Sequence, residues 1–509
     1  MKVKRTIRRI FNSLFVIMMS FIVVAIFVPP KSINWVKAFG SYDVWLKILI
    51  VILAVMLVAF RVWLYGKTTA LKTKLSSRKL LIIGGVLALI LCFVATYLFM
   101  PEPYNTFDSA EIYGFVRKAS VGAVIDNEVY FNRHPHNLGI VIFYLSFVRL
   151  GVLLGMKNAQ ILMPIVTSLA VAITILISAY IAGKAIKRSS GVRVWIVMLI
   201  TPALLYSAEM YTDSISAFFI ALELFVMLKI RECRRKKEKA LLCVILAAFA
   251  GVGAVIKITS LIPVIAFGIV ALLKKGRSSI NKKQLLRACG VGAICLVCFA
   301  GILLGYKNIQ KNILPGTKES ALPYTHWVMM GMGGDGIFNS EDLEASLSHM
   351  PNTTEYNIDA MKNRLGEMGP LGYIWLLARK VSVTWGDGTY EISRVVGTQP
   401  RRPDSRLIQV IGVYGRYFKY YRFVTTVFQL SWLIVFLVMA FLTRKKNNNK
   451  VLVLKLALIG IFTFLLIWET NSRYLVNFLP LLIILQEYSI GVLWKKISTK
   501  SLGKYLASS

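Results

Sequence analysis

Charged side chains gather in one short segment that lies between two apolar runs of the sequence. Residues 106–139 read TFDSAEIYGFVRKASVGAVIDNEVYFNRHPHNLG. The segment contains two acids and three basic side chains suited to chemistry: Asp108, Glu111, Arg133, His134 and His136. Carboxylates beside the mouth of a membrane span cost free energy unless they bind or catalyse something. We therefore predict catalytic roles for Asp108 and Glu111, and substrate contacts for the three basic side chains.

Structural roles compete with chemistry in this segment. Asp108, followed three residues later by Glu111, resembles a capping box, so we expect capping and catalysis as alternative or simultaneous roles. His134 and His136 flank Pro135 at an expected helix start. Hydrogen bonding to loop backbone is the commoner role for histidines there, and metal binding the less common one.

Further polar residues lie at the ends of later apolar runs. They occur in the segments SAEMYTDS, GVGAVIKITS, YTHWVMMGMGGDG, ARKVSVTWGDG and WETNSRY: Glu209, Asp213, Lys257, His326, Lys380, Trp385, Asp387, Glu469, Arg473 and Tyr474. Carboxylates and cations alternate in this set. Such a mixture suits a phosphate-linked substrate, because cations bind the phosphate while a carboxylate deprotonates the attacking hydroxyl.

Several of these residues also have structural alternatives. Asp213 precedes an apolar run and is a candidate helix cap. Lys257 follows one and is placed to extend its ammonium to the headgroups. Glu469 and Arg473 are four residues apart, which allows them to pair with each other on a helix.

The elements that hold these residues are membrane-spanning helices. The 509 residues are 56% hydrophobic, and the apolar residues come in long runs, which predicts an all-α polytopic membrane protein. The net charge of +37 lies mostly in short turns between the runs, so it reports topology, and we expect no nucleic-acid partner. The positive-inside rule places both termini in the cytoplasm.

The number of crossings depends on one region. Between His136, expected outside, and the basic turn GKAIKRSSGVR, expected inside, there are two apolar runs, at about 137–155 and 159–183. Two crossings would violate parity. We interpret residues 158–183 as a pair of short or re-entrant helices, which gives 12 crossings, or 14 if both span.

These runs divide the chain into four parts. Residues 1–70 form an additional transmembrane hairpin, and 71–305 form a transmembrane core whose first outer loop is 101–136. Residues 306–422 form an extracytoplasmic loop domain, and 423–509 form the last helices and a cytoplasmic tail. The end of the loop domain is rich in Arg and Tyr. That composition favours an interfacial anchor, with a track for lipid phosphates as the alternative.

Other machinery is absent from the sequence. It has no Gly-rich phosphate loop after a strand, no zinc-type Cys/His spacing and no nucleophile elbow. Cys295 and Cys298 have redox spacing, but they lie within an apolar run, which favours packing.

The order of the motifs resembles that of the GT-C glycosyltransferase superfamily. The closest likeness is to Gram-positive, multi-spanning relatives of the protein O-mannosyltransferases. The acidic first loop, the HPHN span start, YTD, the Gly-rich run ending at Lys257, THWVMMG, WGDGTY and the late ETNSRY carry this resemblance. It covers roughly residues 79–494. Each motif is short, so the resemblance rests on the order of the motifs and on their common placement at the expected outer surface.

The resemblance implies a GT-C-like bundle that transfers a sugar from a polyprenyl-phosphate donor to an extracytoplasmic acceptor with inversion. The acid of the first loop, Asp108, would act as base, and membrane lipids would be partners. Donor phosphate binding would fall to Lys257, Lys380, Arg473 and Tyr474. Substrate contacts would add Asp213, His326, Trp385, Asp387 and Glu469. The doubled histidine leaves a divalent metal, Mg or Mn, open, and the expected location is a bacterial plasma membrane.

Two other functions compete with a sugar transferase. A polysaccharide polymerase or ligase would also combine many spans with a large outer loop, but it would depend on Arg and His rather than on Asp108. A flippase without chemistry would show repeats and charges in the middle of its spans. In this sequence the charges gather at the expected outer ends.

Overall fold

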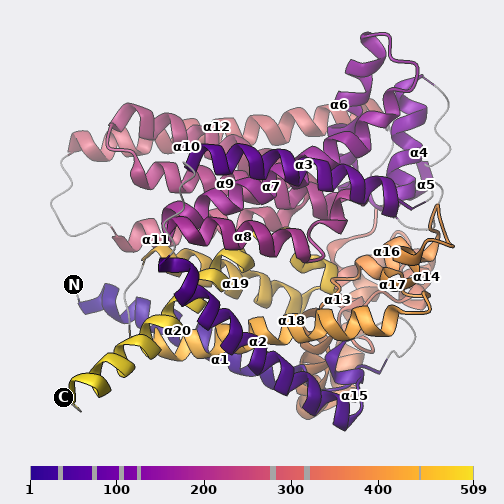
Figure 1. Ribbon diagram of the computed structural model, residues 1–509. Helices are drawn as coiled ribbons and strands as arrows, with labels where there is room; N and C mark the ends of the chain where they lie inside the picture. The colour runs from indigo at the N-terminus through magenta and orange to yellow at the C-terminus, as the bar shows by residue number, and fades with distance from the viewer. Residues whose placement is uncertain are drawn as a thin grey trace.

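The computed structural model describes residues 2–31, 38–70, 77–101, 108–122, 128–274, 282–313, 321–445 and 449–507. This described part is helical and contains no β-strand, only an isolated bridge between Pro101 and Pro400. Figure 1 shows a bundle in which most of the long helices run side by side. The prediction of an all-α polytopic membrane protein is confirmed.

Most helices fall on the predicted apolar runs. The first half of the chain forms α1 (Lys2–Ala25), α2 (Val44–Ala70), α3 (Ser77–Phe99), α4 (Asp108–Ser120), α5 (Glu128–Arg133), α6 (Leu138–Leu153), α7 (Leu162–Ala185), α8 (Arg188–Ile200), α9 (Thr212–Glu232) and α10 (Lys236–Ile256). The second half forms α11 (Leu261–Lys274), α12 (Lys282–Ile313), α13 (Tyr324–Met330), α14 (Ser340–Ser348), α15 (Thr353–Gly386), α16 (Ile392–Thr398), α17 (Arg406–Ile411), α18 (Phe418–Leu442), α19 (Asn449–Ile467) and α20 (Leu479–Ala507).

Nine helices in the described ranges are long and apolar enough to cross a membrane: α1, α2, α3, α6, α7, α10, α12, α18 and α20. Three shorter apolar helices, α8, α11 and α19, accompany them. α9 is as long as a span but carries several charges, among them Glu223. It packs against α7 and α10 inside the bundle.

The predicted pair of short helices at residues 158–183 is wrong. α7 is one continuous helix of 24 residues, which packs along α3, α8 and α9. Pro164 does not break the helix, because it lies in the first turn, where a backbone N–H would have no carbonyl partner within the helix. Thr167, Thr174 and Ser178 bond their hydroxyls to the carbonyls four residues earlier, so these polar side chains are satisfied within the helix.

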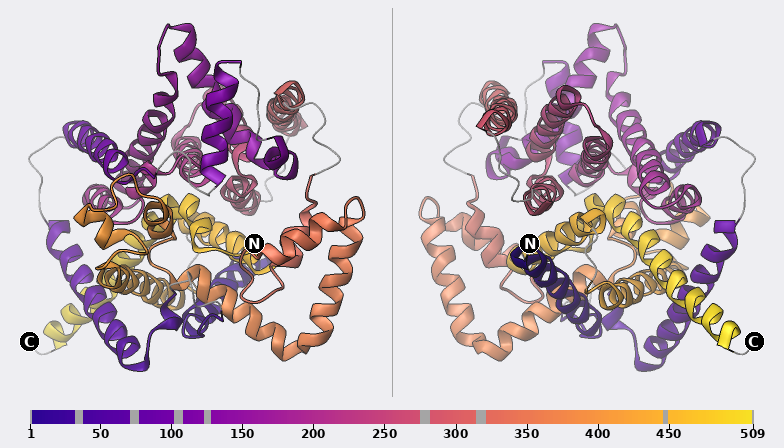
Figure 2. Two further views of the ribbon diagram at one scale, coloured as in Figure 1. Left: turned by 90° about the vertical axis from the view of Figure 1, so that its right-hand side faces the viewer. Right: turned by 90° about the vertical axis from the view of Figure 1, so that its left-hand side faces the viewer.

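The first two helices pack against the last three. α1 contacts α18 and α19, and α2 contacts α18 and α20. Figure 2 shows the indigo N-terminal helices beside the orange and yellow helices of the C-terminal part. The additional hairpin therefore belongs to the same core as the end of the chain.

The polar segments lie at one end of the bundle. Figure 1 shows α4, α5 and α13 to α17 at the end opposite both termini. α15 bends sharply at Gly369, which has φ +59°, immediately before Pro370. Beyond this kink its last turns are buried, so that Val381 and Trp385 contribute to the core. The second half of the predicted loop domain therefore returns into the bundle.

Candidate functional site

Asp108 is the first residue of α4, and its carboxylate receives strong polar contacts. The Tyr211 hydroxyl donates to Oδ2 at 2.8 Å, and Arg473 Nη2 lies 3.6 Å from the same oxygen. Burial alone would raise the pKa of Asp108, but Arg473 and the hydrogen bonds of Tyr211 and Tyr130 together lower it below its usual value. The side chain is still 35% exposed. Asp108 is thus an ionised carboxylate that a substrate can reach.

Arg473 lies between two carboxylates and two aromatic rings. Besides Asp108, it faces Glu391, whose Oε2 is 3.9 Å from its Nε. Its guanidinium carbon is 5.2 Å from the Tyr211 ring centroid and 5.7 Å from that of Tyr474. Nε is buried and makes no hydrogen bond. Arginine binds phosphate through such N–H donors, so Arg473 retains capacity for an anionic ligand.

Lys257 forms an ion pair with Asp213 beside this arginine. Asp213 lies in the first turn of α9, whose N-cap residue is Tyr211, so the capping alternative is wrong for Asp213. The Lys257 ammonium is 4.8 Å from the Tyr474 ring centroid and points to the buried carboxylate, so the headgroup alternative is also wrong. Lys257 adds positive charge to the site, although Asp213 already neutralises part of this charge.

Two further acids, Glu209 and Glu469, are buried around the cluster. Burial raises the pKa of Glu209 to about 8 and that of Glu469 to about 7. The Tyr474 hydroxyl donates to Glu469 at 3.2 Å. The predicted pair between Glu469 and Arg473 is not formed, because the chain between them adopts no α-helical turn and Arg473 turns to Asp108 and Glu391.

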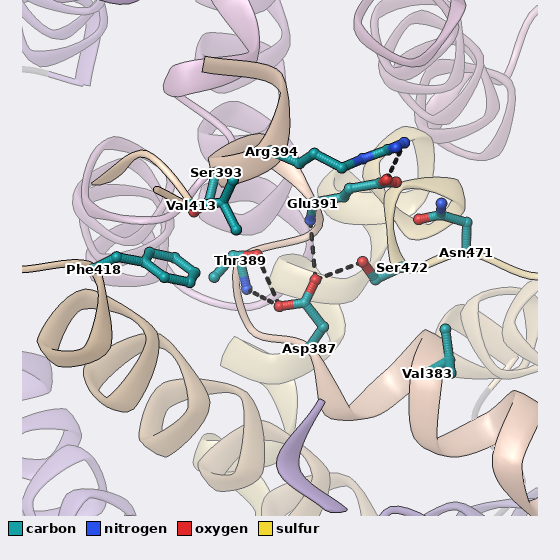
Figure 3. A pocket seen from close by; sticks show the side chains of 10 residues that line it. All are labelled: Val383, Asp387, Thr389, Glu391, Ser393, Arg394, Val413, Phe418, Asn471 and Ser472. Atoms are coloured by element: carbon teal, nitrogen blue, oxygen red, sulfur yellow. Dashed lines mark hydrogen bonds and ion pairs between the residues drawn. The ribbon is translucent and has the colours of Figure 1, made fainter. Parts of the chain in front are cut away.

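Glu391 is a site residue that sequence reasoning missed. It follows the WGDGTY motif, where Tyr390 and Glu391 both have positive φ, 50° and 62°. Asp387 holds this turn: its carboxylate accepts from the backbone N–H groups of Thr389 and Glu391 and from the Ser472 hydroxyl. Figure 3 shows these bonds and the ion pair of Glu391 with Arg394. The one indication of this role in the sequence is that Glu391 lies four residues after Asp387.

Four predicted site residues have structural roles instead. Lys380 is 1% exposed, and its ammonium donates to the carbonyls of Gly331, Leu466 and Trp468 at 2.8–2.9 Å, so no proton remains for a phosphate. His326 is buried against Ser346, with Nδ1 2.8 Å from the hydroxyl. Trp385 is buried in the core. Asp387 likewise uses both oxygens to hold its turn, which replaces the substrate contact expected of it.

A cavity of about 530 Å³ opens beside Asp108. Its lining comes from the first outer loop and from the segment around α14: Asp108, Glu111, Val129, Tyr130, Arg133, His134, Phe338 and Leu343. Four of the predicted residues therefore face one space. His136 is not among the lining residues, and its ring centroid is 5.2 Å from that of Trp327. Nowhere in the described ranges do three His, Cys, Asp or Glu side chains converge as metal ligands.

Buried polar atoms without hydrogen bonds are concentrated in this region. They include Oδ2 of Asp213 and Nε of Arg473, while the carboxylate oxygens of Glu391 make no hydrogen bond but lie beside the guanidinium groups of Arg394 and Arg473. Each such atom costs free energy if nothing binds it. This concentration indicates a site that water or a polar ligand completes.

The fold and the site together define a class: an all-helical polytopic membrane protein with a charged cavity at the end opposite its termini. Over residues 1–493 the chain matches the model of a family described as conserved hypothetical integral membrane protein, and it belongs to that family. No curated protein and no solved structure matches it.

Proposed function

We propose that this protein is a glycosyltransferase of the bacterial plasma membrane that moves a sugar from a polyprenyl-phosphate donor to an acceptor in the cell envelope. The cavity then faces the outside, and both termini lie in the cytoplasm. One observation carries the proposal: a reachable, ionised Asp108 lines a large cavity and directly contacts an arginine that has an unused buried donor.

The chemistry is an inverting displacement. The acceptor hydroxyl attacks the anomeric carbon, a new carbon–oxygen bond forms, and the bond from that carbon to the donor phosphate breaks. Asp108 takes the proton of the hydroxyl, and the lipid phosphate leaves with the electron pair. Arg473, assisted by Lys257, stabilises the negative charge that develops on this phosphate. Glu111 and Tyr130 line the same cavity and are placed to contact the acceptor.

Purified protein in lipid nanodiscs tests this function with labelled sugars on synthetic polyprenyl phosphates. Asp108→Asn removes the base and should lower transfer at least about 100-fold while donor binding persists. Asp359→Asn, which changes an acid 61% exposed on α15, is the matched control and should transfer normally. A chelator arm reports whether Mg or Mn takes part.

Each outcome distinguishes between possible functions or site assignments. Full transfer by Asp108→Asn would show that the base has been misassigned. A wild-type protein that binds donors but turns none over would contradict the transferase and favour the polymerase or flippase reading.

A further inference from the structure

A second charged cluster lies within the membrane-spanning part and has no place in the proposed reaction. It consists of Arg61 on α2, Arg193 on α8 and Glu487 on α20, and we refer to it as the arginine cluster. Arg61 lies 17 residues after the start of α2, which is about 25 Å along the helix axis. The cluster is therefore distant from the end that carries Asp108.

Arg193 is fully engaged by protein groups. Its Nε donates to Glu487 at 2.8 Å, Nη1 donates to the Thr68 hydroxyl at 2.6 Å, and Nη2 donates to the Ser190 hydroxyl at 3.2 Å. The guanidinium carbon is 4.3 Å from the Tyr65 ring centroid. These contacts join α2, α8 and α20, so the position of Arg193 is fixed.

Arg61 has no comparable set of contacts. Its Nη1 is buried and makes no hydrogen bond, and Glu487 is the one carboxylate in the described part of the chain that attracts its charge. Glu487 already binds Arg193 through Oε1, with Nη2 at 2.6 Å. Two guanidinium groups thus share one carboxylate, which leaves one net positive charge among apolar helices. An uncompensated buried charge is strongly unfavourable, so an anion is needed here.

The surroundings indicate that this anion comes from the lipid. The side chains next to Arg61 along α2, Phe60 and Trp63, are more than half exposed. These apolar groups would face acyl chains, and tryptophan favours the membrane interface. Basic pockets between helices are suited to the phosphate of an anionic lipid, because arginine binds phosphate through paired N–H donors.

We infer that the arginine cluster binds the phosphate of an anionic phospholipid in the leaflet on the side of the chain termini, between α2, α8 and α20. Arg61 supplies the free donor and the excess charge, while Arg193 and Glu487 hold the frame. The ligand chemistry is a phosphate ester.

The test compares lipid-dependent stability in two kinds of nanodisc. Full-length wild-type protein should melt at a higher temperature in discs of phosphatidylglycerol than in discs of phosphatidylcholine, and native mass spectrometry should detect retained phosphatidylglycerol. Arg61→Gln should lose both effects, with retained lipid reduced about fivefold. Arg61→Lys, which keeps the charge, should retain most of the binding. Arg149→Gln, an exposed arginine on α6, is the control and should behave as wild type.

The variant remains interpretable even if it alters folding. Arg61→Gln removes an uncompensated cation, so in phosphatidylcholine it should be at least as stable as wild type. If Arg61→Gln still responded to phosphatidylglycerol as the wild-type protein does, the inference would be overturned. If millimolar inorganic phosphate stabilised wild type in phosphatidylcholine as much as phosphatidylglycerol does, the ligand would be a soluble phosphate, and the assignment to a lipid would be wrong.

Discussion

Glu209 shows what burial does to a single carboxyl group in this site. Its pKa is raised to about 8, so the folded protein holds a proton that the unfolded chain releases near pH 4.5. Stability should therefore fall as the pH rises from about 5 to about 8, by up to roughly 1.4 kcal/mol per pH unit. Glu209→Gln should remove this loss, so its melting temperature should exceed that of wild type increasingly toward pH 8.

The control for Glu209 is again Asp359→Asn, whose exposed carboxylate should leave the pH dependence of melting unchanged. A constant difference between Glu209→Gln and wild type across this range would contradict the raised pKa.

Arg473 is predicted to act through its planar donors as well as its charge. Arg473→Lys keeps the charge but loses the fork that binds two phosphate oxygens. Under the proposed function, the KM for the donor should rise about tenfold, with a smaller change in kcat. Arg416→Lys, which changes an exposed arginine beside Tyr417, serves as control and should leave the KM unchanged. An unchanged KM in Arg473→Lys would place the phosphate elsewhere.

Lys380 shows how one residue joins three elements. Its ammonium links the last turns of α15 to the chain after α13 and to the end of α19. Lys380→Met should lower the free energy of unfolding by at least about 3 kcal/mol, because three buried carbonyls lose a charged donor. Chemical denaturation measures this loss. Lys362→Met, at an exposed position of α15, should cost little, and equal effects of both variants would contradict the cross-link.

The positions of the helices could be predicted from the sequence more completely than the way in which the helices connect. Long apolar runs locate almost every membrane helix, because burial and span length leave a strong periodic or continuous pattern. α7 was predicted wrongly because parity required an odd number of crossings between His136 and the basic turn, whereas α6 and α7 are each one continuous apolar helix. Hydropathy measures how apolar a helix is and carries no information about its direction.

The site was predictable as a set of residues but not as a set of pairs. Asp108, Arg473 and Lys257 were predicted to serve one site and do lie together. The partner of a buried charge is decided by tertiary packing, so the same reasoning misassigned Lys380 and overlooked Glu391. Both errors concern contacts between elements that are distant in sequence.

The whole molecule is expected to hold its first two helices without a covalent link. α1 and α2 pack against α18, α19 and α20, so residues 1–70 and 71–509 expressed as separate chains should copurify. Gly66→Leu should prevent this, because a Cβ at Gly66 would lie 2.4 Å from the Trp494 ring. Gly268→Leu, where a Cβ would meet nothing within 4 Å, is the control. Failure of the unmodified pair to copurify would show that the hairpin needs its linker.

The position of Arg473 between Asp108 and Glu391 has a consequence for the timing of the proposed reaction. Its distances to the two carboxylates, 3.6 and 3.9 Å, are nearly equal and longer than a hydrogen bond. A phosphate that takes over this guanidinium would weaken its hold on Asp108 and add negative charge nearby, and both effects increase the proton affinity of Asp108. The base would therefore become strong only once the donor is bound, which protects the lipid-linked sugar from being spent on water by an empty enzyme.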